Sequence, residues 1–193
     1  CIAILLAELS EYIAHRTAHT IPFVWDLHEF HHSATEMNIF CKDRNTPLES
    51  AITTPIIMPI NIFSGLLLNE YISRGFLIPT LIYLIYMTLE EIATIGGHCS
   101  YPIIYPKPLS HLLMSPACHL IHHSINPKHY DCNMGTTFTI WDKIFGTYLD
   151  ESHLKEINGF GVLNSEYNKV NPFFSILFLP VLKLIRRIKF KLI

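Results

Sequence analysis

The stretch AITTPIIMPINIFSGLLLN, residues 51–69, contains no charged side chain and decides the fold class. A helix needs about 20 predominantly apolar residues to cross the hydrocarbon core of a bilayer, so this stretch is nearly sufficient by itself. Pro55, Pro59 and Asn61 lie inside it. We therefore expect either a kinked membrane helix or a re-entrant segment at these residues.

A second apolar run follows the polar break at residues 70–75. It covers residues 76–89, meets Glu90 and Glu91, and resumes over residues 92–97. Because the uncharged part is short for a span, we expect the two glutamates near the membrane interface or inside the protein. We interpret the two runs as a helical hairpin, with two buried helices of a soluble protein as the alternative. A hairpin returns the chain to the side of the membrane that it left.

Composition supports a membrane protein with one active site. Half of the 193 residues are hydrophobic and 16% are charged, whereas about 25% of residues in soluble domains are charged. The net charge of −2 and the restriction of basic clustering to residues 183–191 give no basis for binding nucleic acid. The five cysteines contain no CxxC pair, so neither a disulfide framework nor a zinc ribbon or iron–sulfur site is expected.

The two ends of the chain predict further membrane contact. Residues 1–7 are apolar but too few to cross a bilayer, and we expect the sequence to be a fragment that lacks the upstream part of its first membrane helix. Residues 172–182 are apolar and run into the basic tail, which favours an interfacial helix on the cytoplasmic side. Four prolines within residues 101–116 indicate an irregular connector, and Pro116 is placed to open the next helix.

Ten of the twelve histidines form five elements on the two flanks of the predicted hairpin. These elements are HRTAH (15–19), HEFHH (28–32), His98, HLIHH (119–123) and His129. Residues three and four positions apart share a helix face, so HxxxH is expected to direct two imidazoles at one point and HxxHH three. The hairpin would place both flanks on one face of the membrane. His111 and His153 fall outside this spacing and are left out of the site.

The number of imidazoles exceeds what one tetrahedral ion can bind, and it suits two metal ions. Imidazole accommodates iron, zinc or copper; zinc is redox-inactive, whereas iron with open coordination positions can activate O2. Single pairs of this kind also occur as solvated helix faces or core histidines, but five elements together favour a metal site. Carboxylates near enough in sequence to support the ligands, or to be ordinary interfacial charges, are Asp26, Glu29, Glu90, Glu91 and Asp131.

Five motifs are specific enough to indicate a family. They are HRTAH (15–19), LHEFHHS (27–33), HLIHHS (119–124), Asn133-Met134-Gly135 and WDKIFGTY (141–148). In this order the chain resembles the fatty acid hydroxylase and sterol desaturase superfamily. The resemblance implies an all-α bundle of membrane helices with a cytosolic histidine-rich cap that holds a dimetal centre. Residues 1–150 would form the catalytic domain and residues 151–193 a C-terminal extension.

The same resemblance implies a ligand set and a reaction. The histidines that match the family positions are His15, His19, His28, His31, His32, His98, His119, His122, His123 and His129. The implied cofactors are two iron ions, with O2 as co-substrate, and the implied reaction hydroxylates or desaturates a sterol, fatty acyl or alkyl chain taken from the bilayer. The metal site would lie on the cytoplasmic face of the endoplasmic reticulum or of a bacterial inner membrane.

Other positions are expected to support the site. The chain has no GxGxxG or iron–sulfur motif, so electrons are expected from an external donor such as cytochrome b5 or a ferredoxin with its reductase. Arg44 with residues 47–49 also matches the family, although Thr46 stands where many relatives have histidine. Asn133 and Asp142 are expected to anchor a turn through polar contacts. Packing roles are expected for Trp141, Phe145 and Tyr148.

A histidine-rich membrane protein that binds or transports metal without turnover is the competing interpretation. Transport requires polar or ionisable ligands within the membrane spans. The histidines here lie beyond the ends of the predicted spans, which favours the enzyme.

Overall fold

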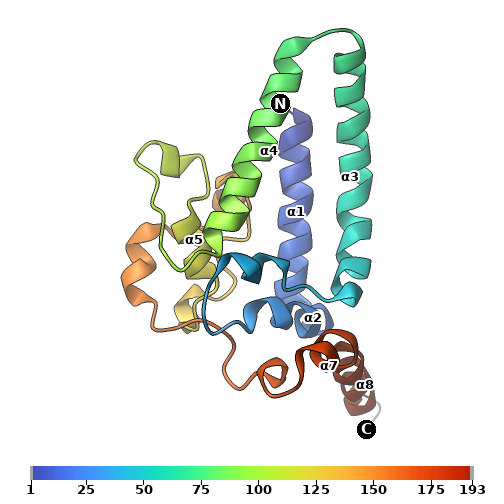
Figure 1. Cartoon of the computed structure of the whole chain (residues 1–193), viewed down its shortest axis with the longest axis vertical. Helices are drawn as coiled ribbons and strands as arrows, with labels where there is room; N and C mark the ends of the chain where they lie inside the picture. The colour runs from blue at the N-terminus through green and yellow to red at the C-terminus, as the bar shows by residue number, and fades with distance from the viewer. Residues whose placement is uncertain (1, 192–193) are drawn as a thin grey trace.

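The computed structural model describes residues 2–191, and over this range the chain is helical, with two isolated β-bridges and no strand. Three long helices stand side by side and the shorter elements gather at one end of them (Figure 1). The elements in chain order are α1 Ile2–Thr20, α2 Pro22–His32, η1 Ile39–Asp43, α3 Pro47–Ser73, α4 Leu77–Gly97, η2 Leu109–His111, α5 Pro116–His122, η3 Pro127–His129, α6 Ile140–Phe145, η4 Glu151–Glu156, η5 Glu166–Asn168, α7 Pro172–Leu177 and α8 Leu179–Lys191. The predicted all-α class is confirmed.

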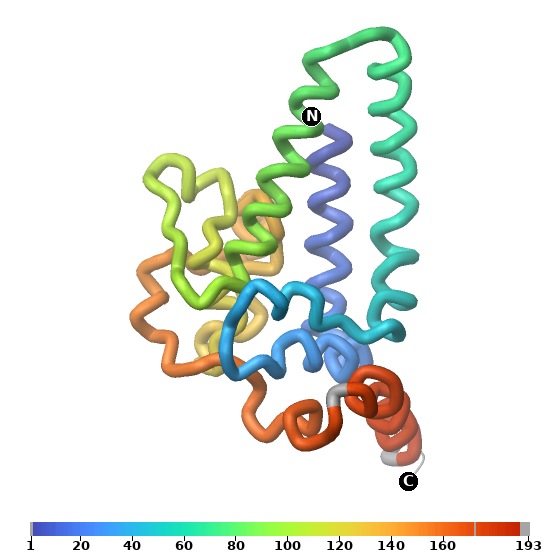
Figure 2. Tube along the Cα trace, in the orientation of Figure 1, coloured from blue at the N-terminus to red at the C-terminus, as the bar shows by residue number. Residues whose placement is uncertain are grey.

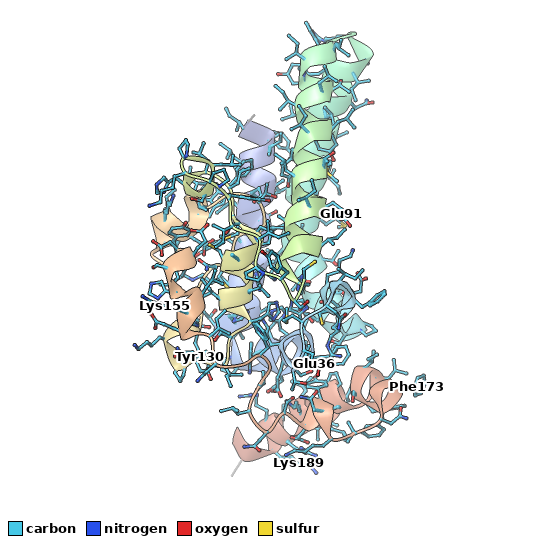
Figure 3. The ribbon with its side chains drawn as sticks, turned by 60° about the vertical axis from the view of Figure 1, so that its left-hand side comes forward. Glu36, Glu91, Tyr130, Lys155, Phe173 and Lys189 are labelled. Carbon is cyan, nitrogen blue, oxygen red and sulfur yellow. The ribbon has the colours of Figure 1, made fainter. Side chains whose placement is uncertain are left out.

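Helices α3 and α4 form the predicted hairpin and extend beyond the apolar runs. Their 27 and 21 residues correspond to about 40 and 31 Å of helix, enough to cross a hydrocarbon core of about 30 Å. Both are long and apolar enough to span a membrane. Their side chains project outward along most of their length (Figure 3), and Leu66, Leu77 and Ile78 are 65–71% exposed. Of the two alternatives, the re-entrant segment is wrong, because α3 continues as one helix through Pro55 and Pro59.

A proline-directed turn separates α1 from α2. Pro22 occupies the first turn of α2, and the residue before it, Ile21, has an extended backbone with φ −94° and ψ 113°. Proline disfavours the helical conformation in the preceding residue, so the chain cannot continue α1 in a straight line. Helix α2 consequently crosses the end of α1 (Figure 2). This turn brings the histidines of α2 against those at the end of α1.

Two glycines allow α5 to approach the end of α4. A Cβ atom on Gly96 would lie 2.8 Å from the Pro116 side chain, and one on Gly97 would lie 2.8 Å from the His119 side chain. Both distances are shorter than any ordinary contact, so larger residues would push α5 away. The predicted connector over residues 101–116 is irregular apart from η2, and α5 begins at Pro116 as expected.

The C-terminal segment covers the outer side of α2. Phe30, Tyr167 and Leu179 form a buried apolar cluster between α2, η5 and α8. Arg187 donates two hydrogen bonds to the carboxylate of Asp26, at 2.7 and 2.9 Å, and Lys183 pairs with Glu29. Part of the basic face of α8 thus binds the protein. Contact of α7 and α8 with a membrane interface stays a prediction, as does the domain division at residue 150.

Candidate metal centre

Nine of the ten predicted ligands converge where α1, α2, α4 and α5 meet, and they form two clusters. The five-histidine cluster contains His15, His19, His28, His32 and His122. The four-histidine cluster contains His31, His98, His119 and His123. In each cluster, one ligand atom per residue lies within 4.8 Å of all the others. The rings of His32 and His123 stack at 4.4 Å, so the two clusters adjoin each other.

Each HxxHH motif divides its histidines between the two clusters. His28 and His32 enter the five-histidine cluster, whereas His31 enters the other. The HLIHH motif is divided the other way round. Its first and last residues, His119 and His123, lie in the four-histidine cluster, and His122 lies in the five-histidine cluster. The expectation that HxxHH directs three imidazoles at one point is wrong. At 3.6 residues per turn, positions i and i+4 differ by about 40°, but i+3 and i+4 differ by about 100°.

Hydrogen bonds orient the rings of the five-histidine cluster. Nδ1 of His15 lies 2.9 Å from the carbonyl oxygen of Met134, and Nδ1 of His122 lies 2.7 Å from that of Cys132. A carbonyl oxygen only accepts, so each Nδ1 carries the proton and each Nε2 keeps its lone pair. The Nε2 atoms of His19, His28, His32 and His122 are buried and have no hydrogen-bond partner among the described residues. This arrangement fits a bound metal ion.

The four-histidine cluster has the spacing of ligands around one ion. The Nε2 atoms of His98 and His31 are 3.2 Å apart, those of His119 and His98 are 3.3 Å apart, and those of His123 and His119 are 3.1 Å apart. Metal–nitrogen bonds of about 2.0–2.1 Å place neighbouring ligand atoms about 3.0 Å apart in octahedral geometry and about 3.4 Å apart in tetrahedral geometry. His98 donates its Nδ1 proton to the Thr94 carbonyl at 2.7 Å, which leaves its Nε2 free to bind a metal ion.

Burial lowers the pKa of most of these imidazoles. Loss of hydration, followed by repulsion from neighbouring imidazoles, lowers the pKa of His31, His32, His119 and His123 well below its ordinary value. Burial lowers the pKa of His122 to about 3. Only the neutral ring has a lone pair for a metal ion, so the clusters are able to bind metal at neutral pH.

A braced loop supplies the two carbonyls that orient His15 and His122. Asn133 donates from Nδ2 to the carbonyls of Cys118 and Leu149, at 2.9 and 3.0 Å, and its φ of 49° suits asparagine. The carboxylate of Asp142 accepts from the backbone N–H groups of Met134 and Gly135 at 2.7 and 2.8 Å. The predicted anchoring roles of Asn133 and Asp142 are confirmed.

Packing residues behind this loop also match the prediction in part. Phe145 stacks on Tyr12 of α1, with ring centroids 5.1 Å apart. Tyr148 donates a hydrogen bond from its hydroxyl to the Ser110 carbonyl at 3.2 Å. These contacts fasten the end of α6 to α1 and the segment after α6 to the connector.

The supporting carboxylate of the five-histidine cluster is Glu49, which the sequence reasoning missed in that role. Its Oε1 accepts from Nδ1 of His28 at 2.6 Å, and both side chains are buried. Thr46 caps the start of α3 by accepting from the Glu49 N–H at 3.2 Å, which holds the glutamate at the inner end of the helix. The signal available in the sequence was the family match at residues 47–49.

The carboxylates proposed from sequence proximity have different partners in the structure. Asp131 lies 3.4 Å from Nδ1 of His19 and is near enough to support it. Of the two roles left open for Asp26 and Glu29, support of a histidine ligand is wrong, since both bind basic residues of α8. Glu91 pairs with Lys42 at 3.4 Å on the surface, and Figure 3 shows it on α4.

His129 is not brought to either cluster. It ends η3, and its ring lies 6.1 Å from that of His153. A sequence separation of six residues from His123 allowed proximity to the clusters, but the turn at η3 directs the side chain elsewhere. Metal binding by the other nine histidines stays a prediction that this geometry suits.

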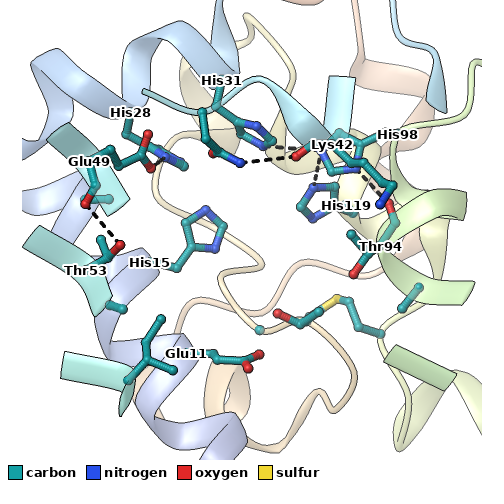
Figure 4. A pocket seen from close by; sticks show the side chains of 18 of the residues that line it. Glu11, His15, His28, His31, Lys42, Glu49, Thr53, Thr94, His98 and His119 are labelled. Carbon is teal, nitrogen blue, oxygen red and sulfur yellow. Dashed lines mark hydrogen bonds and ion pairs between the residues drawn. The ribbon is translucent and has the colours of Figure 1, made fainter. Parts of the chain in front are cut away.

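A cavity of about 260 Å³ opens beside both clusters (Figure 4). His15 and His28 contact it from one cluster, and three histidines contact it from the other: His31, His98 and His119. Its other lining residues include Ala14 on α1, Ile57 on α3 and Ala93 on α4, together with residues outside these helices such as Lys42, Met114 and Thr136. A substrate in this cavity would lie next to both clusters and between the candidate membrane helices.

The chain matches a known protein family over three quarters of its length. Residues 1–147 match the sequence model of the fatty acid hydroxylase family. The chain belongs to the fatty acid hydroxylase family. The resemblance stated for the motifs is thus confirmed across three quarters of the sequence.

Several curated members of this fatty acid hydroxylase family are similar to the chain. An alkylglycerol monooxygenase of Caenorhabditis elegans is 32% identical over 142 residues, 74% of this chain and 25% of that protein. Sphinganine C4-monooxygenase 2 of Arabidopsis thaliana is 28% identical, over 82% of this chain and 57% of that protein. The ornithine lipid hydroxylase OlsE of Rhizobium tropici is 28% identical, over 76% and 40% respectively.

The chain spans only part of these relatives, between 25% and 30% of the length of the four alkylglycerol monooxygenases that it matches. No solved structure matches the chain.

Proposed function

We propose that this chain carries the catalytic site of a membrane-bound lipid hydroxylase, which inserts one oxygen atom of O2 into an unactivated C–H bond. The observation that carries the proposal is the pair of histidine clusters beside one cavity that the candidate membrane helices help to line. The names of the relatives, monooxygenases and hydroxylases, support hydroxylation over desaturation.

Each cluster is proposed to hold one iron ion. Iron is favoured over zinc because the reaction is a redox reaction. When bound, the two ions supply the activation of O2, with two electrons from an external donor such as cytochrome b5 or a ferredoxin with its reductase. The reaction balances when the C–H bond, O2, two electrons and two protons give an alcohol and one water molecule.

The side chains of the protein position the ligands. The Nδ1 protons of His15 and His122 are held on backbone carbonyls, and that of His28 is held on Glu49. These contacts fix three Nε2 lone pairs in place before a metal ion binds. The apolar side chains of Ile57 and Met114 line the cavity, where they can orient a lipid chain and keep water from the reacting C–H bond.

A lipid chain is the proposed substrate because apolar space continues along the same helices. A second cavity of about 570 Å³ lies between α1, α3 and α4, lined by apolar residues such as Phe63, Leu68 and Ile82. Tyr86 borders this second cavity, and Ala93, two turns further along α4, borders the first. An alkyl or acyl chain from the bilayer could thus extend along α4 toward the histidines.

The competing function is metal binding or transport without turnover. His98 caps the C-terminus of α4, and Glu49 supports the five-histidine cluster from the first turn of α3. Both contacts lie at the ends of the candidate spans, whereas transported ions need ligands within them.

The proposed site lies on the cytoplasmic face of the endoplasmic reticulum or of a bacterial inner membrane.

Metal analysis of the detergent-purified chain, expressed with iron available, tests the proposal. Two irons per chain are expected, one for each cluster. His122→Ala should remove mainly the ion of the five-histidine cluster, His123→Ala mainly that of the four-histidine cluster, and the double variant both. His111→Ala, an exposed histidine outside both clusters, is the control and should keep both ions.

Lipid, O2 and a reductant should then give a hydroxylated product with the iron-loaded protein and none with the double variant. Two bound irons without an oxidised lipid would favour the metal-binding function. A protein that takes up no iron, or whose iron is unchanged in the double variant, would contradict the proposed centre.

A further inference from the structure

A third group of metal-ligating side chains lies outside the two histidine clusters. We propose that His129, His153 and Glu156 form a separate site for a divalent transition-metal ion, with zinc as the best fit. The site joins η3, which ends at His129, to η4, which carries His153 and Glu156. It does not depend on the proposed hydroxylation, because none of its residues belongs to either cluster.

The three residues are close enough to share one ion. One ligand atom from each lies within 4.8 Å of the other two. Nδ1 of His153 and Oε1 of Glu156 are 3.1 Å apart, and two ligands of one tetrahedral zinc ion are separated by about 3.4 Å. The side chains of His153 and Glu156 are 35% and 28% exposed, so both can rotate toward a shared ion.

His129 supplies the independent indication that a ligand is missing. The side chain and backbone of His129 are 0% exposed, and neither of its ring nitrogens has a hydrogen-bond partner among the described residues. Native structures seldom leave a buried polar side chain unpaired, because the lost hydration is not replaced. A metal ion between His129 and the two residues of η4 would satisfy one of these nitrogens.

The donor set favours zinc. Two imidazoles and one carboxylate form a common zinc ligand set, with water completing the tetrahedron. Calcium and magnesium prefer oxygen ligands, so they are poorer candidates. The partly exposed side chains give the ion a path from solvent.

The position of the site links it to the braced loop. Asn126 already joins η3 to η4 by donating from Nδ2 to the Glu156 carbonyl at 3.0 Å. Directly after η3 the chain enters the loop whose Cys132 and Met134 carbonyls orient His122 and His15. An ion at His129 would restrain the start of this loop.

Lys128 opposes the binding of a cation. Its Nζ lies 3.6 Å from Oε2 of Glu156, but its side chain is 78% exposed and can move into solvent. Exposed ion pairs contribute little, so the lysine weakens the site without blocking it. Lys128→Ala should therefore tighten zinc binding by about threefold, an effect that a purely structural role for His153 and Glu156 would not produce.

The test adds zinc chloride to the detergent-purified full chain after iron loading, removes unbound metal, and counts zinc and iron per chain. The wild-type protein should gain one zinc without losing iron. His153→Ala and Glu156→Gln should weaken this binding by roughly tenfold or more, whereas His111→Ala should bind as the wild type does. Zinc should also raise the melting temperature of the wild-type protein, but not that of the two variants.

Equal zinc uptake by the wild type, His153→Ala and Glu156→Gln would overturn the proposal, as would a wild type that gains no zinc. Zinc gained only in exchange for iron would show binding at the histidine clusters and would also overturn it. The two variants change partly exposed side chains, so they should stay folded where His129→Ala can fail to fold. Because the readout is the difference in zinc between the wild type and His153→Ala, its failure is separate from failure of the proposed hydroxylation.

Discussion

Replacing Glu49 should weaken binding of the ion proposed for the five-histidine cluster while the chain remains folded. The Glu49 carboxylate accepts from His28 Nδ1 at 2.6 Å, and the two side chains are 8% and 7% exposed. A hydrogen bond to a charged group contributes roughly 1.5–3 kcal/mol, which corresponds to about a tenfold to hundredfold change in an equilibrium constant. Loss of a carboxylate behind a metal-binding histidine falls in the same range.

Two substitutions separate charge from hydrogen bonding. The Glu49→Gln amide can still accept from His28 but is neutral, so iron affinity should fall by about tenfold. Glu49→Ala removes the acceptor, and the loss should approach about a hundredfold. Thr46 still caps the backbone N–H of residue 49 in both variants.

The assay is iron retention during titration with a chelator of known affinity, with iron counted per chain. Glu91→Gln is the matched control, because Glu91 is exposed and pairs with Lys42 rather than with a histidine. Its iron affinity should equal that of the wild type. Equal retention by the wild type, Glu49→Gln and Glu49→Ala would refute the view that this carboxylate holds His28 in place. An equal loss in Glu91→Gln would indicate a general effect of charge.

Two further predictions concern stability. Arg187→Ala removes the paired hydrogen bonds that fasten α8 to Asp26 of α2, and because Arg187 is 39% exposed the free energy of unfolding should fall by only about 1 kcal/mol. Thermal melting in detergent measures this loss, and an equal shift in Arg186→Ala, whose pair with Glu166 is more exposed, would contradict it. In the metal-free protein, the unfolded chain binds protons near the ordinary histidine pKa of 6.5, whereas burial lowers the folded pKa of His122 to about 3. Stability should therefore decline as the pH falls below about 6.5, and a melting temperature that is constant or rises between pH 7 and pH 5 would contradict this sign.

Local patterns predicted much of the architecture. The charge-free run at residues 51–69 predicted a membrane-length helix because a span is a property of consecutive residues. Pro116 predicted the start of α5, since proline suits the first helical turn. The anchoring roles of Asn133 and Asp142 also followed from side chains that bind nearby backbone groups.

Histidine spacing alone predicted a dimetal site, but it could not sort the ligands. Spacing determines the direction of each side chain around its own helix. The partner that a side chain meets depends on how α2 and α5 cross, which the turn at Pro22 and the close approach at Gly97 decide. His31 and His122 therefore each lie in a different cluster from the other two histidines of their motif.

The sequence by itself determined the helical class, the hairpin, the family and the histidines from which a metal centre can be built. Only the tertiary structure showed that Glu49 supports His28, that α8 binds Asp26, and that His129 lies beside His153. The physical reason is that hydropathy and helical periodicity act over a few residues. Glu49 and His28 are 21 positions apart in the sequence, and Arg187 and Asp26 are 161 positions apart. Only the packing of the helices brings such residues together.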